Sequence, residues 1–361
     1  MCRISGLAPD VTVDTVYGAL VTERTWRFGN IDECLERYLF GLCSLPLFHS
    51  RSHYEFHINM ATSLLKPGIL AGLNILITGA SSGIGQATAI ACAEAGASSL
   101  ILFARSKDKL EETARSIRAI SRNRPGPKDK TDVYIDSVDV RDAKAVYTAV
   151  ERILHDGITQ IDVLINNAGL AIGAPASFPE LKLEDIDTMV DTNLKGMLYT
   201  SHAVLNTSSV STGSMLQRKE GTIMNITSTT ALEVPPFPGE AIYHTTKAAQ
   251  EGFTNSLRTE LQGTNIRVLA LRPGVVADTT FHKQRTGFRK DAYDSFMEGF
   301  EPLTAADVAE QIVWVLAQGA RKERVSVKAL DIVPSAQRML YVIDKDWNKR
   351  NGVGDTKMED S

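Results

Sequence analysis

Short apolar runs alternate with amphipathic segments between residues 72 and 335. The runs are apolar almost throughout, which is typical of strands buried on both faces of a sheet. The segments between them repeat apolar residues at intervals of three and four, as helices that cover a sheet do. The predicted strands are 74–78, 99–103, 133–138, 162–165, 222–227, 266–271 and 325–333, and the predicted helices are 85–95, 107–120, 143–155, 183–205, 242–261 and 305–317.

This alternation predicts an α/β fold of the Rossmann type, with a doubly wound parallel sheet of about seven strands and helices on both faces. Residues 72–340 would form a single dinucleotide-binding catalytic domain. Residues 1–71 show no such alternation and are interpreted as an N-terminal extension, and residues 341–361 as a polar C-terminal tail. Because the segment at Met60 resembles a natural start, we hypothesise that residues 1–59 are absent from the mature protein.

Composition narrows the function classes. The chain has 361 residues, 43% of them hydrophobic, and a net charge of -4, which argues against a disordered or coiled-coil protein and against general attraction to nucleic acid or membranes. The longest apolar run near the N-terminus, residues 38–48, is too short to span a bilayer. Four cysteines without CxxC spacing predict a reduced compartment, the cytoplasm.

Three regularly spaced histidines form a candidate metal site. His49, His53 and His57 are four residues apart and would share one face of a helix. Nothing nearby supplies the cysteine or carboxylate partners that a metal site usually has, so a polar segment without metal is the favoured interpretation. We expect no metal.

A glycine-rich turn follows the first predicted strand. Gly79 would allow the tight turn, Gly83 would let the backbone approach a pyrophosphate, and Gly85 would let the next helix pack on the strand. The N-terminus of that helix offers free N–H groups to phosphate. Such a loop between a strand and a helix predicts a dinucleotide site, although a simple connecting turn remains the alternative.

The end of the second predicted strand bears on the choice of nucleotide. Enzymes that use NAD usually place Asp or Glu there to bind the ribose 2′-hydroxyl. This chain has Ala104 and then Arg105, whose guanidinium can form paired hydrogen bonds to a 2′-phosphate. The pattern predicts NADP(H), with a solvated surface arginine as the alternative.

Catalytic chemistry is predicted near a second helix. Tyr243 and Lys247 are four residues apart and would share a helix face, where an ammonium would favour the phenolate. Tyr243 could then exchange a proton with a substrate oxygen. Ser228, at the end of a predicted strand, could hydrogen-bond the same oxygen, and Asn193 is a polar residue inside a long predicted helix. Separately, each has an ordinary surface alternative.

Together these residues resemble the short-chain dehydrogenase/reductase family, over residues 72–335. The motifs that carry the resemblance are Thr78-Gly79-x-x-x-Gly83-x-Gly85, Asp139-Val140, Asn166-Asn167-Ala168-Gly169, Asn193, Ser228, Tyr243-x-x-x-Lys247 and Arg272-Pro273-Gly274. The resemblance implies a homodimer or homotetramer paired through the helices that carry Asn193 and Tyr243. It implies catalysis by Ser228, Tyr243, Lys247 and Asn193, with Lys247 lowering the pKa of Tyr243 and Asn193 holding a water. It implies cofactor contacts by Gly79, Ser81, Ser82, Gly83, Ile84, Gly85, Arg105, Asp139, Val140, Asn167, Tyr243, Lys247, Gly274, Val276 and Thr279.

Within the family, residues 161–173, 258–264 and 273–281 are similar to the branch of NADP-dependent serine 3-dehydrogenases and 3-hydroxy acid (L-allo-threonine) dehydrogenases. That branch has an arginine at the position of Arg285, so the resemblance implies that Arg285, with Lys283 or Arg289, binds a substrate carboxylate. Ser228 and Tyr243 are two residues further apart than in the branch, across a proline-rich insert at residues 233–238.

The sequence thus predicts an NADP(H)-dependent oxidoreductase that moves a hydride between nicotinamide and a secondary alcohol or ketone. The favoured substrate is a small 3-hydroxy acid such as serine. Two alternatives remain: a carbonyl reductase for a larger hydrophobic ketone, which the proline-rich insert suggests, and a non-catalytic NADP-binding regulator.

Overall fold

The computed structural model describes residues 68–122, 130–233, 238–320, 325–340 and 342–357. The proposed start at Met60, the histidine triplet and nearly all of the predicted N-terminal extension lie outside these ranges. The described residues belong to one compact unit, Thr62–Ser361. All structural statements below concern the described part of this unit.

Seven parallel strands form the central sheet, in the order β3-β2-β1-β4-β5-β6-β7. This confirms the predicted Rossmann-type α/β fold, and every predicted strand is present within a few residues of its expected position. The strands are β1 (Asn74–Thr78), β2 (Ser99–Ala104), β3 (Asp132–Ser137), β4 (Val163–Asn166), β5 (Glu220–Ile226), β6 (Asn265–Pro273) and β7 (Ala329–Ile332).

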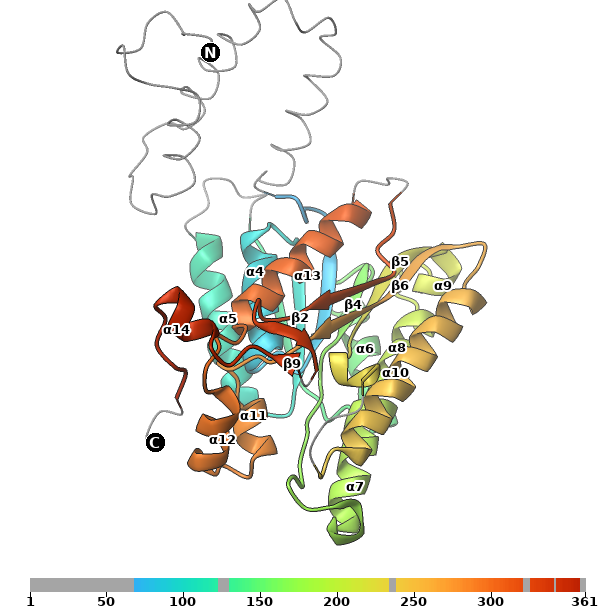
Figure 1. The fold of residues 1–361 in the computed structure, drawn as a ribbon. Helices are drawn as coiled ribbons and strands as arrows, with labels where there is room; N and C mark the ends of the chain where they lie inside the picture. The colour runs from blue at the N-terminus through green and yellow to red at the C-terminus, as the bar shows by residue number, and fades with distance from the viewer. Residues whose placement is uncertain (1–67, 123–129, 234–237, 321–324, 341, 358–361) are drawn as a thin grey trace, which may run out of the picture. The chain divides into compact units, whose positions relative to one another are not determined.

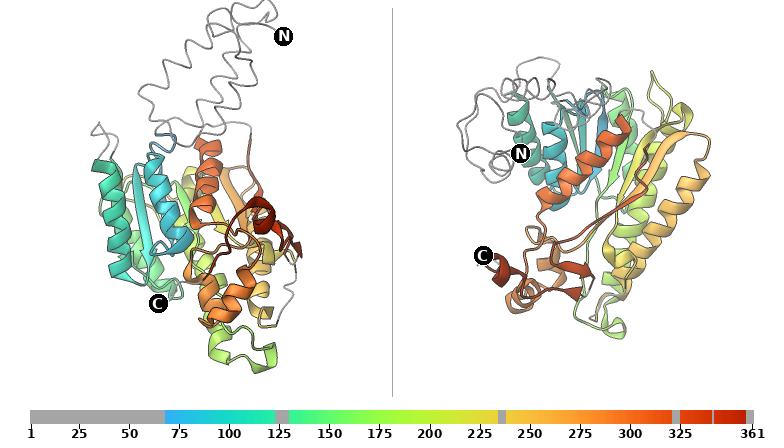
Figure 2. Two further views of the ribbon diagram at one scale, coloured as in Figure 1. Left: turned by 60° about the vertical axis from the view of Figure 1, so that its left-hand side comes forward. Right: turned by 45° about the horizontal axis from the view of Figure 1, so that its top comes forward.

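Helices cover both faces of the sheet, as Figure 1 and the turned views of Figure 2 show. In β1, Ile75 and Ile77 join one hydrophobic cluster while Leu76 joins another, because successive side chains of a strand point to opposite faces. The first cluster is covered by α4 (Gly83–Glu94), α5 (Lys107–Arg122) and α13 (Ala305–Ala320), and the second by α6 (Ala143–His155), α8 (Gly196–Asn206) and α10 (Ala241–Glu260).

The strand order reverses direction at β1, which lies between β2 and β4. In parallel sheets the crevice outside the carboxyl ends of the strands at such a point is where ligands bind. Thr78, the last residue of β1, braces this crevice: its Oγ1 accepts hydrogen bonds from the N–H groups of Asn167 and Ala168, at 3.0 and 3.1 Å. The fold therefore places the glycine-rich turn beside the loop that follows β4.

The long helix predicted over residues 183–205 is divided into three segments. These are α7 (Leu183–Met189), a π-helical segment η3 (Val190–Lys195) and α8. A π-helical turn holds one more residue than an α-helical turn, and such turns are frequent at functional sites. Asn193 lies in this segment and is fully buried. The prediction of one regular helix was wrong because periodicity does not register the extra residue.

Several short elements were not predicted either. α9 (Met215–Arg218) begins at Ser214, whose hydroxyl accepts a hydrogen bond from the Gln217 N–H, while the Gln217 side chain accepts from the Ser214 N–H. This capping box is readable in the sequence. A single 3-10 turn, η2 (Phe178–Glu180), precedes α7.

The C-terminal residues 342–355, predicted to be part of a polar tail, contribute to the domain. A small cluster contains Val275, Tyr293 and Phe300, and Trp347 packs against it. Tyr293 donates a hydrogen bond to the Ala277 carbonyl. The elements involved are α11 (Thr280–Arg285), α12 (Lys290–Met297), β8 (Gln337–Met339), β9 (Val342–Ile343) and α14 (Trp347–Asn351).

Among the described residues, no helix is long and apolar enough to cross a membrane.

Packing of α14 gives a stability prediction. Trp347→Ala removes a half-buried indole from this cluster, so we expect unfolding free energy to fall by about 2 kcal/mol. Denaturant titration followed by circular dichroism measures it. Lys349→Ala, an exposed change in the same helix, is the control and should change little. Equal stability of the two variants would contradict the packing of this segment.

Candidate active site

A cavity of about 680 Å³ opens at the carboxyl ends of the central strands. It extends from the glycine-rich turn to α11 and α12. All predicted site residues except Gly85 and Asn193 line it; those that do are Gly79, Ser81, Ser82, Gly83, Ile84, Arg105, Asp139, Val140, Asn167, Ser228, Tyr243, Lys247, Gly274, Val276, Thr279 and Arg285. The structure therefore brings together residues from seven separate stretches of sequence.

The glycine-rich turn has the close packing that its sequence requires. Gly79 and Gly83 have positive φ angles of 68° and 53°. A Cβ atom on Gly85 would lie 2.3 Å from the Gly79 carbonyl oxygen, and one on Gly83 would lie 3.2 Å from Thr279 Cγ2. Any side chain at Gly85 would push the turn and α4 apart. Gly85 is packed beneath the turn, against Gly79 and Asn167, and does not line the cavity.

The N-terminus of α4 begins directly after this turn. Ser82 is its N-cap, and the Ser82 side chain makes no capping hydrogen bond. The first N–H groups of a helix carry partial positive charge and bind phosphate well. The turn, the open helix end and the cavity in front of them fit the pyrophosphate of a dinucleotide.

The part of the cavity next to the end of β2 has exposed cations. Arg105 is exposed and lines it, and so does Lys109 of α5, which the sequence argument missed. Lys109 lies in the first turn of α5, directly after the loop that carries Arg105, and this closeness in sequence was a usable signal. The carboxylate of Asp139 accepts a hydrogen bond from Arg141 Nη2 at 2.6 Å, and this hydrogen bond keeps the pKa of Asp139 below its usual range.

Asn167 supports the turn from behind. Its side-chain amide donates to the carbonyl oxygens of Thr78 and Gly79, at 3.0 and 3.3 Å. At the opposite end, a Cβ atom on Gly274 would lie 2.5 Å from the Gln337 side-chain oxygen, so the backbone passes close to β8 there.

Tyr243, Ser228 and Lys247 converge although they come from different elements. Ser228 follows β5 and begins the 3-10 turn η4 (Thr229–Ala231), where its hydroxyl accepts a hydrogen bond from the Thr230 N–H. Tyr243 and Lys247 lie one turn apart in α10, with the Lys247 nitrogen 5.7 Å from the centre of the Tyr243 ring. All three side chains are buried at the cavity wall.

Burial is the main cause of the pKa shifts of Tyr243 and Lys247. Burial raises the pKa of Tyr243 to about 12, while Arg285 and a hydrogen bond with Ser228 lower it in part. Burial lowers the pKa of Lys247 to about 7, partly offset by Glu251. The charge of Arg285 is the largest of the influences that lower the pKa of Tyr243 against this burial. Because Lys247 is itself desolvated, its own charge is only partly retained at neutral pH.

Lys247 is held by two hydrogen bonds, one to the Ile226 carbonyl at 3.0 Å and one to the Gln250 side-chain oxygen at 3.1 Å. The Gln250 side-chain nitrogen in turn donates to the Asn193 carbonyl at 2.5 Å. A protein side chain therefore connects Lys247 to the Asn193 backbone. Gln250 was missed, although its spacing of three from Lys247 on one helix was a usable signal.

The Asn193 side chain does not face the cavity. Its amide group exchanges hydrogen bonds with the backbone of Leu170, at 2.8 and 2.9 Å, and also donates to Thr246 at 3.1 Å. These bonds tie η3 to α10 and to the loop after β4. Asn193 thereby fixes the positions of the elements that carry the other three residues.

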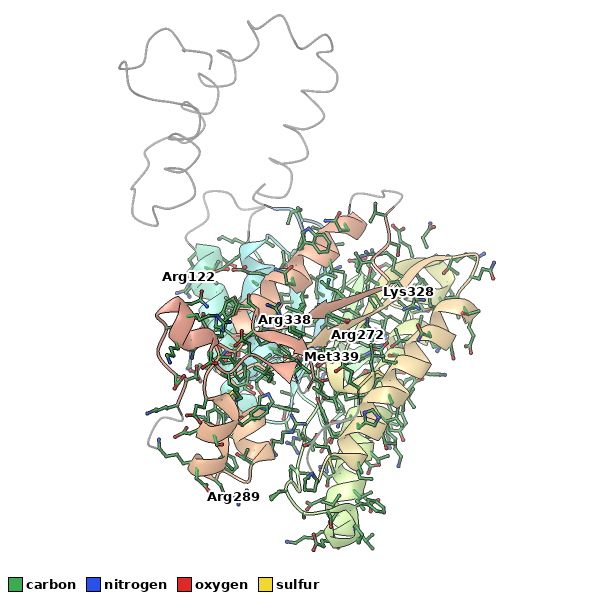
Figure 3. The ribbon with its side chains drawn as sticks, in the orientation of Figure 1. Arg122, Arg272, Arg289, Lys328, Arg338 and Met339 are labelled. Carbon is green, nitrogen blue, oxygen red and sulfur yellow. The ribbon has the colours of Figure 1, made fainter. Side chains whose placement is uncertain are left out.

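Arg285 reaches the cavity beside Tyr243, but it is already paired. Its Nε donates to Glu240 Oε1 at 2.6 Å and its Nη2 donates to Glu240 Oε2, and both residues are buried. Glu240 was not predicted, and nothing in the sequence links two residues 45 positions apart. Of the other two candidate cations, Lys283 does not line the cavity, and Arg289 is exposed at the lower edge of the molecule in Figure 3.

Apolar side chains complete this end of the cavity, including Leu170, Phe281, Phe296 and Leu340. The Phe281 ring lies 5.5 Å from that of Tyr243. The Leu340 N–H donates to Glu233 at 2.5 Å, which connects the C-terminal segment to the edge of the insert. Among the described residues, no group of three side chains could hold a metal ion.

Comparison with known proteins places this site in a family. A sulfoacetaldehyde reductase 2 from Chromohalobacter salexigens is 37% identical over 75% of this chain and 98% of its own length. A serine 3-dehydrogenase from Agrobacterium fabrum is 35% identical over 73% of this chain and 94% of its own.

Among solved structures, the closed form of a serine dehydrogenase complexed with NADP+ aligns with a TM-score of 0.60 at 31% identity, covering 73% of this chain and 96% of that one. The family model described as "short chain dehydrogenase" matches residues 73–289. This range holds the complete glycine-rich turn and the Ser228, Tyr243 and Lys247 group. The chain belongs to the short chain dehydrogenase family of oxidoreductases.

Proposed function

We propose that this enzyme interconverts a secondary alcohol and a ketone, with Tyr243 as the group that exchanges the proton. The observation that carries the proposal is the convergence of Ser228, Tyr243 and Lys247 at the wall of a cavity that begins at a dinucleotide-binding turn. A phenol with a pKa of about 12 is a proton donor at neutral pH, which suits ketone reduction.

Each residue has a part in this reaction. Tyr243 gives its proton to the substrate oxygen as the carbonyl is reduced, and takes it back when an alcohol is oxidised. The Ser228 hydroxyl donates a hydrogen bond to the same oxygen and polarises the carbonyl. When Lys247 is protonated, its positive charge stabilises the phenolate that Tyr243 becomes after giving up its proton. Gln250, which hydrogen-bonds the Asn193 carbonyl, holds Lys247 in place.

The enzyme uses NADP(H), which supplies or accepts the hydride when it is bound. We assign its 2′-phosphate to Arg105 and Lys109, which line the cavity where β2 ends without an acidic residue. The pyrophosphate is assigned to the turn of Gly79, Gly83 and the start of α4. The nicotinamide end is assigned to the loop that carries Gly274, Val276 and Thr279.

Two substrate classes are compatible with the cavity. A small 3-hydroxy acid such as serine is supported by the relatives named serine 3-dehydrogenase and by the place of Arg285 in the cavity wall. A larger uncharged ketone is supported by the apolar lining and by the pairing of Arg285 with Glu240.

For the assembly, we propose a homodimer or homotetramer paired through α8 and α10. On α10, Gly252 is exposed and a Cβ atom there would have nothing within 4 Å, so a neighbouring helix could approach closely.

Tyr243→Phe tests the proton transfer. It removes only the hydroxyl, so we expect kcat for ketone reduction to fall at least about a hundredfold, the ordinary range for a general acid, with unchanged NADPH affinity. The loss of NADPH absorbance with a panel of ketones measures kcat, and a fluorescence titration with NADPH measures the affinity. A wild-type protein that binds NADPH and reduces no ketone would support a regulator instead, and full activity of the variant would contradict the role of Tyr243.

Arg105→Asp tests the nucleotide. The change removes a charged donor to the 2′-phosphate and adds a carboxylate that can accept from a ribose hydroxyl, so the ratio of kcat/KM for NADPH over NADH should fall about a hundredfold. The control is Arg115→Asp, an exposed position of α5 that does not line the cavity. The same ratio in wild type, variant and control would refute the assignment.

A further inference from the structure

The Glu240–Arg285 pair lies at the substrate end of the cavity. The Arg285 guanidinium carbon is 5.4 Å from the centre of the Tyr243 ring, and Arg285 lines the cavity whereas Glu240 does not. The two carboxylate oxygens of Glu240 take the Nε and Nη2 edge of the guanidinium. This is an edge through which an arginine binds a carboxylate with two parallel hydrogen bonds.

Glu240 is held in this position by its own surroundings. It is the N-cap residue of α10, a helix of 20 residues, where the helix dipole favours a negative charge. The preceding Gly239 has a φ of 89°, and a Cβ atom there would lie 2.6 Å from Ala174 Cα. The backbone before Glu240 is thus packed against the loop that follows β4, and only 3% of Glu240 is exposed.

The pair leaves this end of the cavity close to electrically neutral. The charge of Arg285 is balanced by Glu240, and the His282 imidazole beside it is fully buried and in its neutral form, with a pKa of about 3. A substrate carboxylate at Arg285 would meet the Glu240 carboxylate within the same buried region, and like charges brought together there are costly. Phe281, Phe296 and Leu340 add apolar side chains to this end, and the polar residues beside them, such as Thr230 and Gln284, carry no charge.

We propose that Glu240 determines substrate specificity: by occupying Arg285 it excludes small carboxylate substrates and makes the site selective for uncharged carbonyl compounds. This inference rests on the proposed ketone reduction and decides between its two substrate classes. Specificity here comes from a repulsive element placed behind an arginine that would otherwise attract a carboxylate.

The test uses two substrates with the same ketone, acetoacetate and methyl acetoacetate, with NADPH; the ester differs from the anion by one methyl group, which removes the negative charge. Wild type should reduce the ester with a kcat/KM at least about tenfold higher than the anion. Glu240→Gln keeps the size of the side chain and removes its charge, so the ester-to-anion ratio should fall at least about tenfold. Glu240→Asp keeps the charge and should keep the wild-type preference.

Two further variants separate specificity from structure. In the double variant Glu240→Gln with Arg285→Met, the gain on acetoacetate should disappear, because that gain depends on the released guanidinium. Glu260→Gln removes the same charge from the exposed far end of α10 and should leave the ratio unchanged. Thermal melting of each NADP(H)-bound variant shows whether it is folded.

The outcomes distinguish the two proposals. A wild-type enzyme that reduces the ester but shows the same ratio after Glu240→Gln overturns the role of Glu240 and leaves ketone reduction standing. A wild-type preference for the anion overturns it as well. A wild-type enzyme that oxidises NADPH with neither compound nor with any ketone of the panel counts against the proposed function itself.

Discussion

The hydrogen bond from Lys247 to the Ile226 carbonyl joins the end of the central sheet to α10, and the site depends on it. It spans from the last residue of β5 to the helix that carries Tyr243, so it sets how far the phenol stands from Ser228. Gln250 and the Asn193 carbonyl extend the connection into the π-helical segment. These hydrogen bonds thereby fix three elements that are distant in sequence relative to one another. The proposed catalysis needs this arrangement in addition to the residue types and their spacing.

Burial gives these groups their chemical character. An ammonium in a nonpolar environment loses proton affinity and a phenol gains it, which is why Lys247 and Tyr243 shift in opposite directions, to about 7 and about 12. The site is consequently balanced for donating a proton from Tyr243. Arg285 opposes the shift of Tyr243 and Glu240 supports it. The charges of Glu240 and Arg285 therefore act directly on the pKa of Tyr243, the residue that we propose to exchange the proton.

The sequence was sufficient for the sheet, the six main helical regions and many of the residues that line the cavity, because buried strands and amphipathic helices have distinct periods and the glycine turn has a local steric cause. It was insufficient for Glu240, because a pairing between α10 and α11 is a long-range contact with no local pattern. It did not predict the π-helical turn at Asn193, because one extra residue breaks the expected period there. It did not predict the packing of Trp347 either, because the residues around Trp347 are polar and show no amphipathic pattern. The roles assigned to the site residues remain predictions.

The pH dependence of ketone reduction tests the central claim that a buried, charged Lys247 supports proton donation by Tyr243. Because the pKa of Lys247 is lowered to about 7, the ammonium is present below that pH and lost above it. We expect kcat/KM with NADPH to be constant below about pH 7 and then to decline about tenfold per pH unit as this one proton is lost. A kcat/KM that stays constant from pH 6 to pH 9 would contradict it.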